Sequence, residues 1–264
     1  MAIKLIALDL DGTLLTSDKK ITAHTKDVLT RAMARGVTVT IATGRMLRSA
    51  LHFVRLIGSD APVVCCNGAY IGTEKRTPVF ARYFDTALVR EFLTFVYDRH
   101  WYVNWYIGTE IYAPEYRPEY FTAYRTTADF VVTAVGNDYL RYTENVPQFV
   151  LRNLDDGIGG CLRAVQEHFG DQIVPQQNTG TSLDINPPGV SKAVGVQALA
   201  DAMGLCLDEV MVAGDADNDY EMLEMGAFSV VPENGRPKAK ERARYVTASN
   251  DADGIAAAIE KFVL

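Results

Sequence analysis

Asp9-Leu10-Asp11-Gly12-Thr13 follows the apolar run Ile3 to Leu8 and places two carboxylates one residue apart. The apolar run predicts a buried strand, and in an open α/β sheet ligands bind where such strands end. Because residues i and i+2 of an extended segment point the same way, Asp9 and Asp11 are expected to face one pocket. Gly12 lets the chain turn sharply after them. Taken alone, the stretch is equally typical of an ordinary acidic turn.

A second acidic stretch, Gly214-Asp215-Ala216-Asp217-Asn218-Asp219, follows the apolar run Val210 to Ala213 and is also expected at a strand end. Asp215 could join Asp9 in holding a divalent ion, since Mg²⁺ prefers carboxylate oxygens and waters. A calcium loop is the alternative interpretation. The stretch lacks the spacing of such a loop, and a helical pattern begins almost at once at Tyr220.

Two further stretches supply neutral and positive donors. The β-branched run Val37 to Ala42 ends in Thr43-Gly44-Arg45, and a helical pattern follows, so a hydroxyl lies beside a helix N-terminus that favours anions. Ser191-Lys192 opens another helical pattern after a proline-containing loop. A lysine in a first helical turn is opposed by the helix dipole, so a solvated surface position is the alternative for Lys192 alone.

As a set, these stretches resemble the four motifs of the haloacid dehalogenase superfamily and are similar to its Cof-like phosphatases, with the same order and context. Asn67-Gly68-Ala69, after the apolar run Val63 to Cys66, also matches that group. The resemblance covers roughly residues 1 to 84 and 184 to 264. The stretch Pro232 to Gly235 differs in one respect, because it carries Gly where relatives often show Ala.

The resemblance implies phosphoryl transfer through a covalent aspartyl phosphate. Asp9 is expected to attack the phosphorus as a carboxylate that needs no base. Asp11 is expected to protonate the leaving oxygen and later to deprotonate the hydrolytic water. Mg²⁺ is expected on Asp9, Asp215 and the backbone carbonyl of Asp11. The other expected site residues hold the phosphate or substrate, except Asp219, which orients Lys192 or a water on the metal; they are Leu10, Thr43, Gly44, Arg45, Lys192, Asn218 and Asp219.

The periodicity predicts an α/β fold in which a doubly wound parallel-sheet core, residues 1–84 and 184–264, is interrupted by an inserted α/β domain, residues 85–183. The resemblance implies that this insertion is a cap over the core site. Strands are expected in the core at Lys4–Leu10, Val37–Ala42, Pro62–Cys66 and Val210–Ala213, with helices at His24–Arg35 and Met46–Ile57. In the insertion, helices are expected at Asp85–Arg99 and Cys161–Phe169, with strands near Tyr102–Tyr106, Phe130–Val135, Gln148–Asn153 and Thr181–Ile185, and a hairpin near Gly108-Thr109.

The composition is that of a globular enzyme, with 264 residues of which 48% are hydrophobic and 22% charged. A net charge of −7 argues against a nucleic-acid partner, since binding a polyanion relies on Lys and Arg. The four cysteines have neither disulfide nor metal-ligand spacing, and no stretch approaches the length of a membrane helix. We therefore expect a cytoplasmic protein with no membrane partner, present as a monomer or weak homodimer.

The substrate is expected to be a small phosphorylated metabolite, and a sugar phosphate is favoured. By the resemblance, the core binds the phosphate and the cap selects the rest of the substrate. The aromatic run Trp101 to Tyr106 suits stacking on sugars, although core packing is the favoured interpretation. Two alternatives remain open, a phosphohexomutase-like phosphotransferase and a catalytically silent binding or regulatory protein on the same fold.

Overall fold

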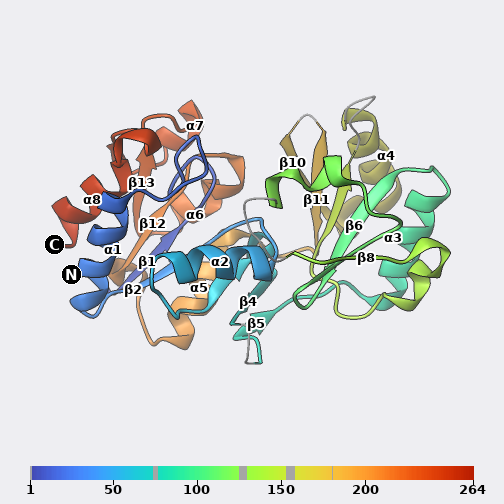
Figure 1. Cartoon of the computed structure of the whole chain (residues 1–264), viewed down its shortest axis with the longest axis horizontal. Helices are drawn as coiled ribbons and strands as arrows, with labels where there is room; N and C mark the ends of the chain where they lie inside the picture. The colour runs from blue at the N-terminus through green and yellow to red at the C-terminus, as the bar shows by residue number, and fades with distance from the viewer. Residues whose placement is uncertain (1, 74–76, 125–129, 153–157, 180) are drawn as a thin grey trace. The chain divides into compact units, whose positions relative to one another are not determined.

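The computed structural model describes residues 2–73, 77–124, 130–152, 158–179 and 181–264. The chain divides into two compact units, and Figure 1 labels most of their helices and strands. The first unit comprises Met1–Arg45, Ala50–Phe80 and Ser191–Leu264, and the second comprises Met46–Ser49 and Ala81–Val190.

The first unit is built on a five-stranded sheet in the order β14-β13-β12-β1-β2. Every neighbouring pair in it is parallel, so all the strands end at the same edge. β1 lies between the strands that precede Thr43 and Asp215, because Leu8 pairs with Ile41 on one side and with Ala213 on the other. The strands are β1 (Leu5–Leu8), β2 (Thr38–Ile41), β12 (Val210–Ala213), β13 (Phe228–Pro232) and β14 (Tyr245–Thr247).

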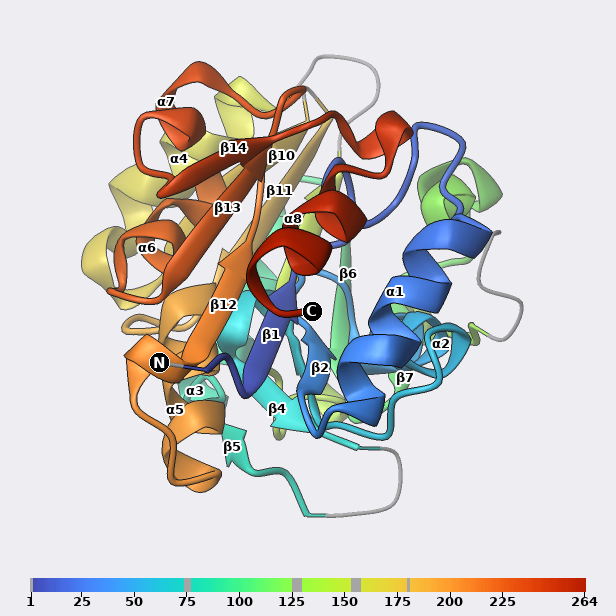
Figure 2. The ribbon, with the colours of Figure 1, turned by 90° about the vertical axis from the view of Figure 1, so that its left-hand side faces the viewer.

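Helices cover both faces of this sheet, as a doubly wound fold requires. α1 (Ala23–Ala34) and α8 (Gly254–Phe262) contact each other, and Figure 2 shows them in front of the strands. α5 (Lys192–Ala202) packs against α6 (Tyr220–Glu224), which contacts β12 and β13. The unit also contains α2 (Leu47–Leu56) from Ala50 onward and the short α7 (Pro237–Lys240). The predicted fold class is confirmed.

A small three-stranded sheet continues the first unit beyond β2. It has the order β3-β4-β5, formed by β3 (Val63–Cys65), β4 (Tyr70–Gly72) and β5 (Phe80–Ala81). A single parallel bridge between Ala42 and Val64 brings β3 alongside the end of β2. The short 3₁₀ turn after β3, η1 (Cys66–Gly68), therefore begins near the edge where β1 and β2 end.

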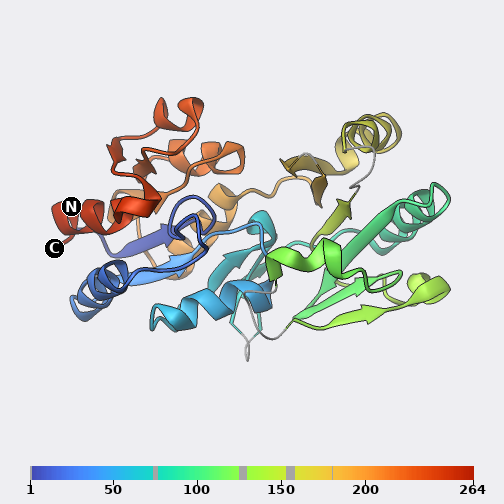
Figure 3. The same cartoon turned by 45° about the horizontal axis from the view of Figure 1, so that its top comes forward.

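The second unit is a six-stranded sheet in the order β10-β11-β9-β6-β7-β8. Its helices α3 (Thr86–Tyr97) and α4 (Gly159–Phe169) cover one face, as Figure 3 shows. The predicted hairpin forms where Ile107 pairs with Glu110, and Gly108 at the turn has φ 59°. The strands are β6 (Tyr102–Ile107), β7 (Glu110–Ala113), β8 (Val132–Ala134), β9 (Phe149–Arg152), β10 (Val174–Thr179) and β11 (Ser182–Asn186).

The structure differs from the expected boundaries in a few places. β11 continues to Asn186, within the second unit, so this unit ends later than residue 183. The domain organisation as drawn from the sequence stays a prediction.

Asn153, the last residue of the strand expected at 148–153, lies outside the described residues. Among the described helices, none has the length and apolar character needed to cross a membrane.

The two faces of the second sheet differ in chemistry. Val103 and Trp105 of β6 belong to the apolar core under α3 and α4, and the Trp105 indole donates to the Tyr142 carbonyl at 2.8 Å. Trp105 is fully buried, which supports the packing interpretation over sugar stacking. The opposite face, called here the polar sheet face, is mostly polar but includes Val150, which pairs with Asn104 and Asp184. Its polar side chains, from the register of β6, β9 and β11, are Tyr102, Asn104, Tyr106, Gln148, Arg152, Asp184 and Asn186.

Candidate active site

Three strand ends bring the predicted site residues together. Asp9 follows β1, and its N–H donates to the Ala213 carbonyl of β12 at 2.9 Å. Asp215 follows β12, and Thr43 follows β2 with its N–H donating to Val64 at 2.9 Å. This convergence follows from parallel pairing, because neighbouring parallel strands place their carboxyl ends at one edge.

Lys192 lies between two carboxylates at the start of α5. The Ser191 side chain caps the helix by accepting from the Val194 N–H, which leaves Lys192 in the first helical position. Its Nζ donates to Asp9 Oδ1 at 2.6 Å and to Asp219 Oδ1 at 2.7 Å. All three side chains are at most 9% exposed. A buried charge needs such partners, and here they offset the unfavourable helix dipole at Lys192.

Asp219 is fully engaged by donors. Its Oδ2 accepts from the backbone N–H groups of Asp215 at 2.9 Å and Ala216 at 3.0 Å, while Oδ1 accepts from Lys192. Gly214 leaves the room for this, because a Cβ there would overlap the Asp219 side chain. Asp219 thereby fixes both Lys192 and the turn that carries Asp215.

The buried charges shift one another's pKa values. Burial raises the pKa of Asp9, and the neighbouring Asp219 and Asp215 add to this, while Lys192 opposes it. Burial and repulsion from Asp219 raise the pKa of Asp215 to about 6. Burial alone would lower the pKa of Lys192, but Asp219 and Asp9 raise it above its usual range. The site therefore carries more negative charge than its lysine balances.

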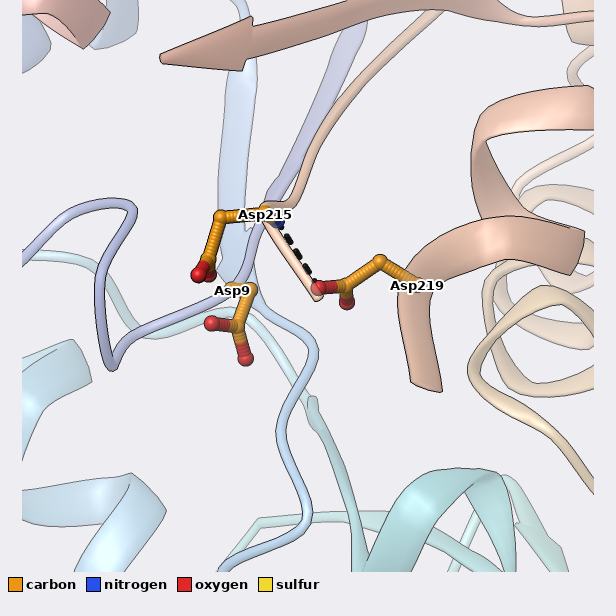
Figure 4. Close-up of side chains that lie close together, drawn as sticks. All are labelled: Asp9, Asp215 and Asp219. Carbon is orange, nitrogen blue, oxygen red and sulfur yellow. Dashed lines mark hydrogen bonds between the residues drawn. The ribbon is translucent and has the colours of Figure 1, made fainter. Parts of the chain in front are cut away.

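A divalent cation fits this imbalance. Single oxygens of Asp9, Asp215 and Asp219 lie within 4.8 Å of one another, and Figure 4 shows the three side chains close together. Asp215 Oδ1 accepts from the Thr13 hydroxyl at 2.9 Å. Among the described residues, no donor reaches Asp9 Oδ2 or Asp215 Oδ2. Since Asp219 is already engaged, Asp9 and Asp215 are the carboxylates able to hold a hard cation.

Asp11 is held by two cations. Arg45 donates to it with two nitrogens, Nε to Oδ2 at 2.8 Å and Nη2 to Oδ1 at 2.9 Å, and Lys19 Nζ donates to Oδ1 at 2.8 Å. Burial would raise the pKa of Asp11, but the bonds to Arg45 and Lys19 outweigh it and lower the pKa to about 2. The carboxyl is therefore ionised in this arrangement at neutral pH.

The remaining predicted residues lie around the same strand ends. Thr43 is buried, and its Oγ1 accepts from the Arg45 N–H at 3.2 Å. Gly44 lies between them in the same turn. The Leu10 carbonyl accepts from the N–H groups of Thr13 and Leu15. Asn218 donates through Nδ2 to Asn67 Oδ1 at 3.3 Å. The structure thus brings these residues to one edge, while their catalytic roles stay a prediction.

Sequence reasoning assigned no role to several residues that hold the site in shape. Asn234 bridges two segments, because its Nδ2 donates to the Gly12 carbonyl at 2.8 Å and its Oδ1 accepts from the Asn250 N–H at 2.9 Å. Asn250 in turn donates to the Leu15 carbonyl at 2.8 Å. The one departure from the family pattern has a steric reason, since a Cβ at Gly235 would lie 2.5 Å from a methyl group of Val231.

The contact between Lys19 and Asp11 was also not predicted from the sequence. It depends on the backbone turn around Lys19. The Lys19 N–H donates to Thr16 at 2.8 Å and the Thr16 N–H to Lys20 at 2.9 Å, so the loop folds back on itself. Lys19 has φ 60° in this turn. The fold-back carries its ammonium to Asp11. No signal in the local sequence marks this contact.

Comparisons with known proteins agree with this geometry. A family model described as haloacid dehalogenase-like hydrolase matches residues 6–259. A Streptococcus pyogenes protein whose name calls it a putative phosphatase is 32% identical over 270 residues, spanning the whole of both chains. 5-Amino-6-(5-phospho-D-ribitylamino)uracil phosphatase YitU of Bacillus subtilis is 27% identical over 98% of this chain and 97% of its own. The solved structure of the sugar phosphatase BT4131, a HAD subclass IIB protein, matches 98% of both chains with a TM-score of 0.83 at 21% identity.

The chain belongs to the haloacid dehalogenase-like hydrolases. The expected enzyme class, a phosphoric monoester hydrolase, is confirmed with the family. The structural match to the solved sugar phosphatase supports the fold. Because the sequence identity is only 21%, the match carries no information on the substrate.

Proposed function

We propose that the protein is a Mg²⁺-dependent phosphatase that hydrolyses a small sugar phosphate through an aspartyl phosphate on Asp9. The observation that carries this proposal is the buried cluster at the strand ends, where Lys192 joins Asp9 and Asp219 at 2.6 and 2.7 Å beside Asp215. A site with this excess of negative charge requires a cation before it can accept a phosphate.

Mg²⁺ suits the oxygens of Asp9 and Asp215, to which we add the backbone carbonyl of Asp11 from the family resemblance. When bound, the ion supplies positive charge that offsets the repulsion between the Asp9 carboxylate and the phosphate. The raised pKa of Asp9 supports this dependence, because burial disfavours the ionised nucleophile until positive charge is added.

The phosphate oxygens have donors of two kinds. Lys192 supplies charge and the Thr43 hydroxyl a neutral donor, and both are buried. The backbone around Leu10 and Gly44, together with the Asn218 amide, would complete the contacts. Asp9 then forms a bond to phosphorus as the ester oxygen leaves, and water later cleaves the resulting acyl phosphate.

Asp11 can act as the acid only after its hydrogen bonds to Arg45 and Lys19 are broken. Its pKa of about 2 leaves it ionised while Arg45 and Lys19 hold it. A phosphate dianion is a competing partner for both cations. We therefore assign to substrate binding the step that loosens this arrangement and lets Asp11 hold the proton it delivers to the leaving oxygen.

The polar sheet face of the second unit carries groups that suit a hydroxyl-rich molecule, such as the leaving group of a sugar phosphate. Asn104 and Gln148 are fully buried there, and the described groups leave Asn104 Nδ2 without an acceptor and Gln148 Oε1 without a donor. Such a neutral donor and acceptor match a hydroxyl, which both donates and accepts. The name of the Bacillus subtilis relative, with its phosphoribityl group, fits the same class of leaving group.

The test is a screen for phosphate release from hexose, pentose and polyol phosphates beside phosphoesters without hydroxyls, each with and without Mg²⁺. Hydroxyl-rich esters should be hydrolysed with the highest kcat/KM, and EDTA should abolish turnover until Mg²⁺ is restored. Full activity after exhaustive chelation would contradict the metal assignment. A sugar phosphate isomer formed without release of phosphate would instead indicate a mutase.

A further inference from the structure

The turn η1 has a backbone that ordinary sequences avoid. Three successive residues have positive φ values, 52° at Cys66, 53° at Asn67 and 91° at Gly68. Only glycine adopts such values freely, and asparagine tolerates them better than other side chains. Strained backbone persists where the surrounding structure holds it, and it is concentrated at functional sites.

Backbone hydrogen bonds join this turn to the segment after β2. The Cys66 N–H donates to the Arg45 carbonyl at 2.9 Å, and the Asn67 N–H donates to the Thr43 carbonyl at 3.1 Å. In the opposite direction, the Thr43 N–H donates to Val64 at 2.9 Å. The turn thus fixes the backbone that presents the Thr43 hydroxyl.

The same turn lies directly against the start of α5. A Cβ on Gly68 would overlap the Ser191 carbonyl and come within 3.3 Å of the Lys192 nitrogen. A Cβ on Gly195 would come within 3.0 Å of the Gly68 Cα. The close approach leaves no space for a side chain at either glycine, so the turn and Lys192 cannot move independently.

The Asn67 side chain reaches a fourth segment. It is 4% exposed, and its Oδ1 accepts from Asn218 Nδ2 at 3.3 Å. An amide that accepts here holds the Asn218 side chain in one orientation, without adding a charge beside the site. An aspartate at position 67 would have the same shape and the same tolerance of positive φ, but it would bring a negative charge toward the phosphate.

We propose that Asn67 is a positioning residue for phosphate binding, acting through its side chain on Asn218 and through its backbone on Thr43. This inference rests on the proposed function, in which Asn218 and Thr43 hold the phosphate. Asn67 is assigned no contact with the reacting atoms.

Two substitutions distinguish the role of the Asn67 side chain from the role of its backbone. Asn67→Gly keeps the positive φ and the bond to Thr43 while removing the acceptor for Asn218, and kcat/KM for p-nitrophenyl phosphate should fall about tenfold. Asn67→Asp keeps the shape and adds charge, and kcat/KM should fall roughly a hundredfold with KM strongly raised. Asn145→Gly is the matched control, because Asn145 has φ 56° and is exposed in the second unit, and its kinetics should stay unchanged.

A double-mutant cycle tests whether Asn67 acts through Asn218. If it does, adding Asn67→Gly to Asn218→Ala should change kcat/KM by less than about twofold. The same cycle is measured with inorganic phosphate and Mg²⁺ by titration calorimetry, so it remains decisive even if no ester is hydrolysed. Phosphate affinity should fall in both single variants by similar factors.

Two results would overturn the proposal. One is that folded Asn67→Gly matches Asn145→Gly in both kcat/KM and phosphate affinity. The other is that the effects of Asn67→Gly and Asn218→Ala multiply independently. Failure of the proposed function has a different signature, namely no phosphate release by the wild type while the phosphate-binding cycle still gives its answer.

Discussion

The aspartate cluster of the first unit and the polar sheet face of the second unit bury polar groups in different ways. In the cluster, the groups are charged and Lys192 joins two of the three carboxylates. On the sheet face, the neutral amides of Asn104 and Gln148 are buried beside Arg152 and Asp184, and each amide has one atom without a described partner. A buried charge without a partner costs far more than a buried amide. The charges of the cluster therefore depend on one another, whereas a buried amide can lack one partner at a lower cost.

Within the aspartate cluster, removing the charge of Asp9 should have the largest effect on phosphatase activity. Asp9→Asn keeps the shape but removes the nucleophilic oxygen, so phosphatase activity should fall by at least about a thousandfold. The fold should persist, because the amide oxygen can still accept from Lys192, and circular dichroism with thermal unfolding checks this. A folded variant with more than a tenth of wild-type activity would rule out the covalent mechanism.

Asp11 should show a smaller effect that depends on the leaving group. A sugar alkoxide needs a proton as it leaves, whereas p-nitrophenolate does not. In Asp11→Asn, kcat/KM should fall roughly a hundredfold for a sugar phosphate and distinctly less for p-nitrophenyl phosphate. The ratio kcat/KM is the required measure, since kcat also contains hydrolysis of the acyl phosphate. An equal fall for both esters would remove Asp11 from the acid role.

The polar sheet face should affect discrimination among substrates rather than basal chemistry. Asn104→Ala should lower kcat/KM about tenfold for hydroxyl-rich phosphates and leave p-nitrophenyl phosphate nearly unchanged. The neighbouring Val103, on the apolar face of the same strand, provides the matched control. Val103→Ala should lower the unfolding free energy without changing the ratio between the two substrates. Equal losses on both substrates in folded Asn104→Ala would assign that side chain to packing.

The pH dependence of stability should show an effect on folding that is separate from the effects on kcat/KM. The pKa of Asp215 is raised in the folded state to about 6, so folding retains its proton between about pH 4 and pH 6. Stability should therefore be lost as pH rises through this range, by at most about 3 kcal/mol from this group. Thermal unfolding of metal-free protein should show the loss, and Mg²⁺ should raise the melting temperature more at pH 7 than at pH 5.

Asp215→Asn is the control for this last prediction. It removes the titrating group, so its melting temperature should fall less between pH 4 and pH 6 and respond less to Mg²⁺ than that of the wild type. A variant whose melting temperature depends on pH as strongly as that of the wild type, or a variant with the full Mg²⁺ response, would contradict the assignment of Asp215.

The cluster was largely predictable from the sequence because its parts lie at the ends of apolar runs. Parallel pairing alone then places Asp9, Thr43 and Asp215 at one edge, without any knowledge of distant contacts. Lys19 and Asn234 could not be found in this way. The first reaches the site through a turn with positive φ, and the second through a bridge between segments more than two hundred residues apart.

The polar sheet face could not be predicted from the sequence for a related reason. Asn104 and Asp184 lie on β6 and β11, and Gln148 directly precedes β9, so only the register of these strands places the three on one face. A shift of one residue in any of these strands would exchange that face for the apolar one. The sequence indicated an α/β insertion but contained no local motif from which the register could be read.

The pairing of β1 with β12 determines when the central sheet can form during translation. β1 pairs with β12, so residues about two hundred positions apart in the chain must meet before the central sheet is complete. During synthesis, the whole second unit and α5 emerge between these two strands. Because chains are elongated from the N-terminus at about 5–20 residues per second, β1 waits roughly ten seconds or more for β12. The nascent chain therefore carries Asp9 without Lys192 or Asp215 over most of its synthesis, and enzymatic activity can begin only when translation is nearly finished.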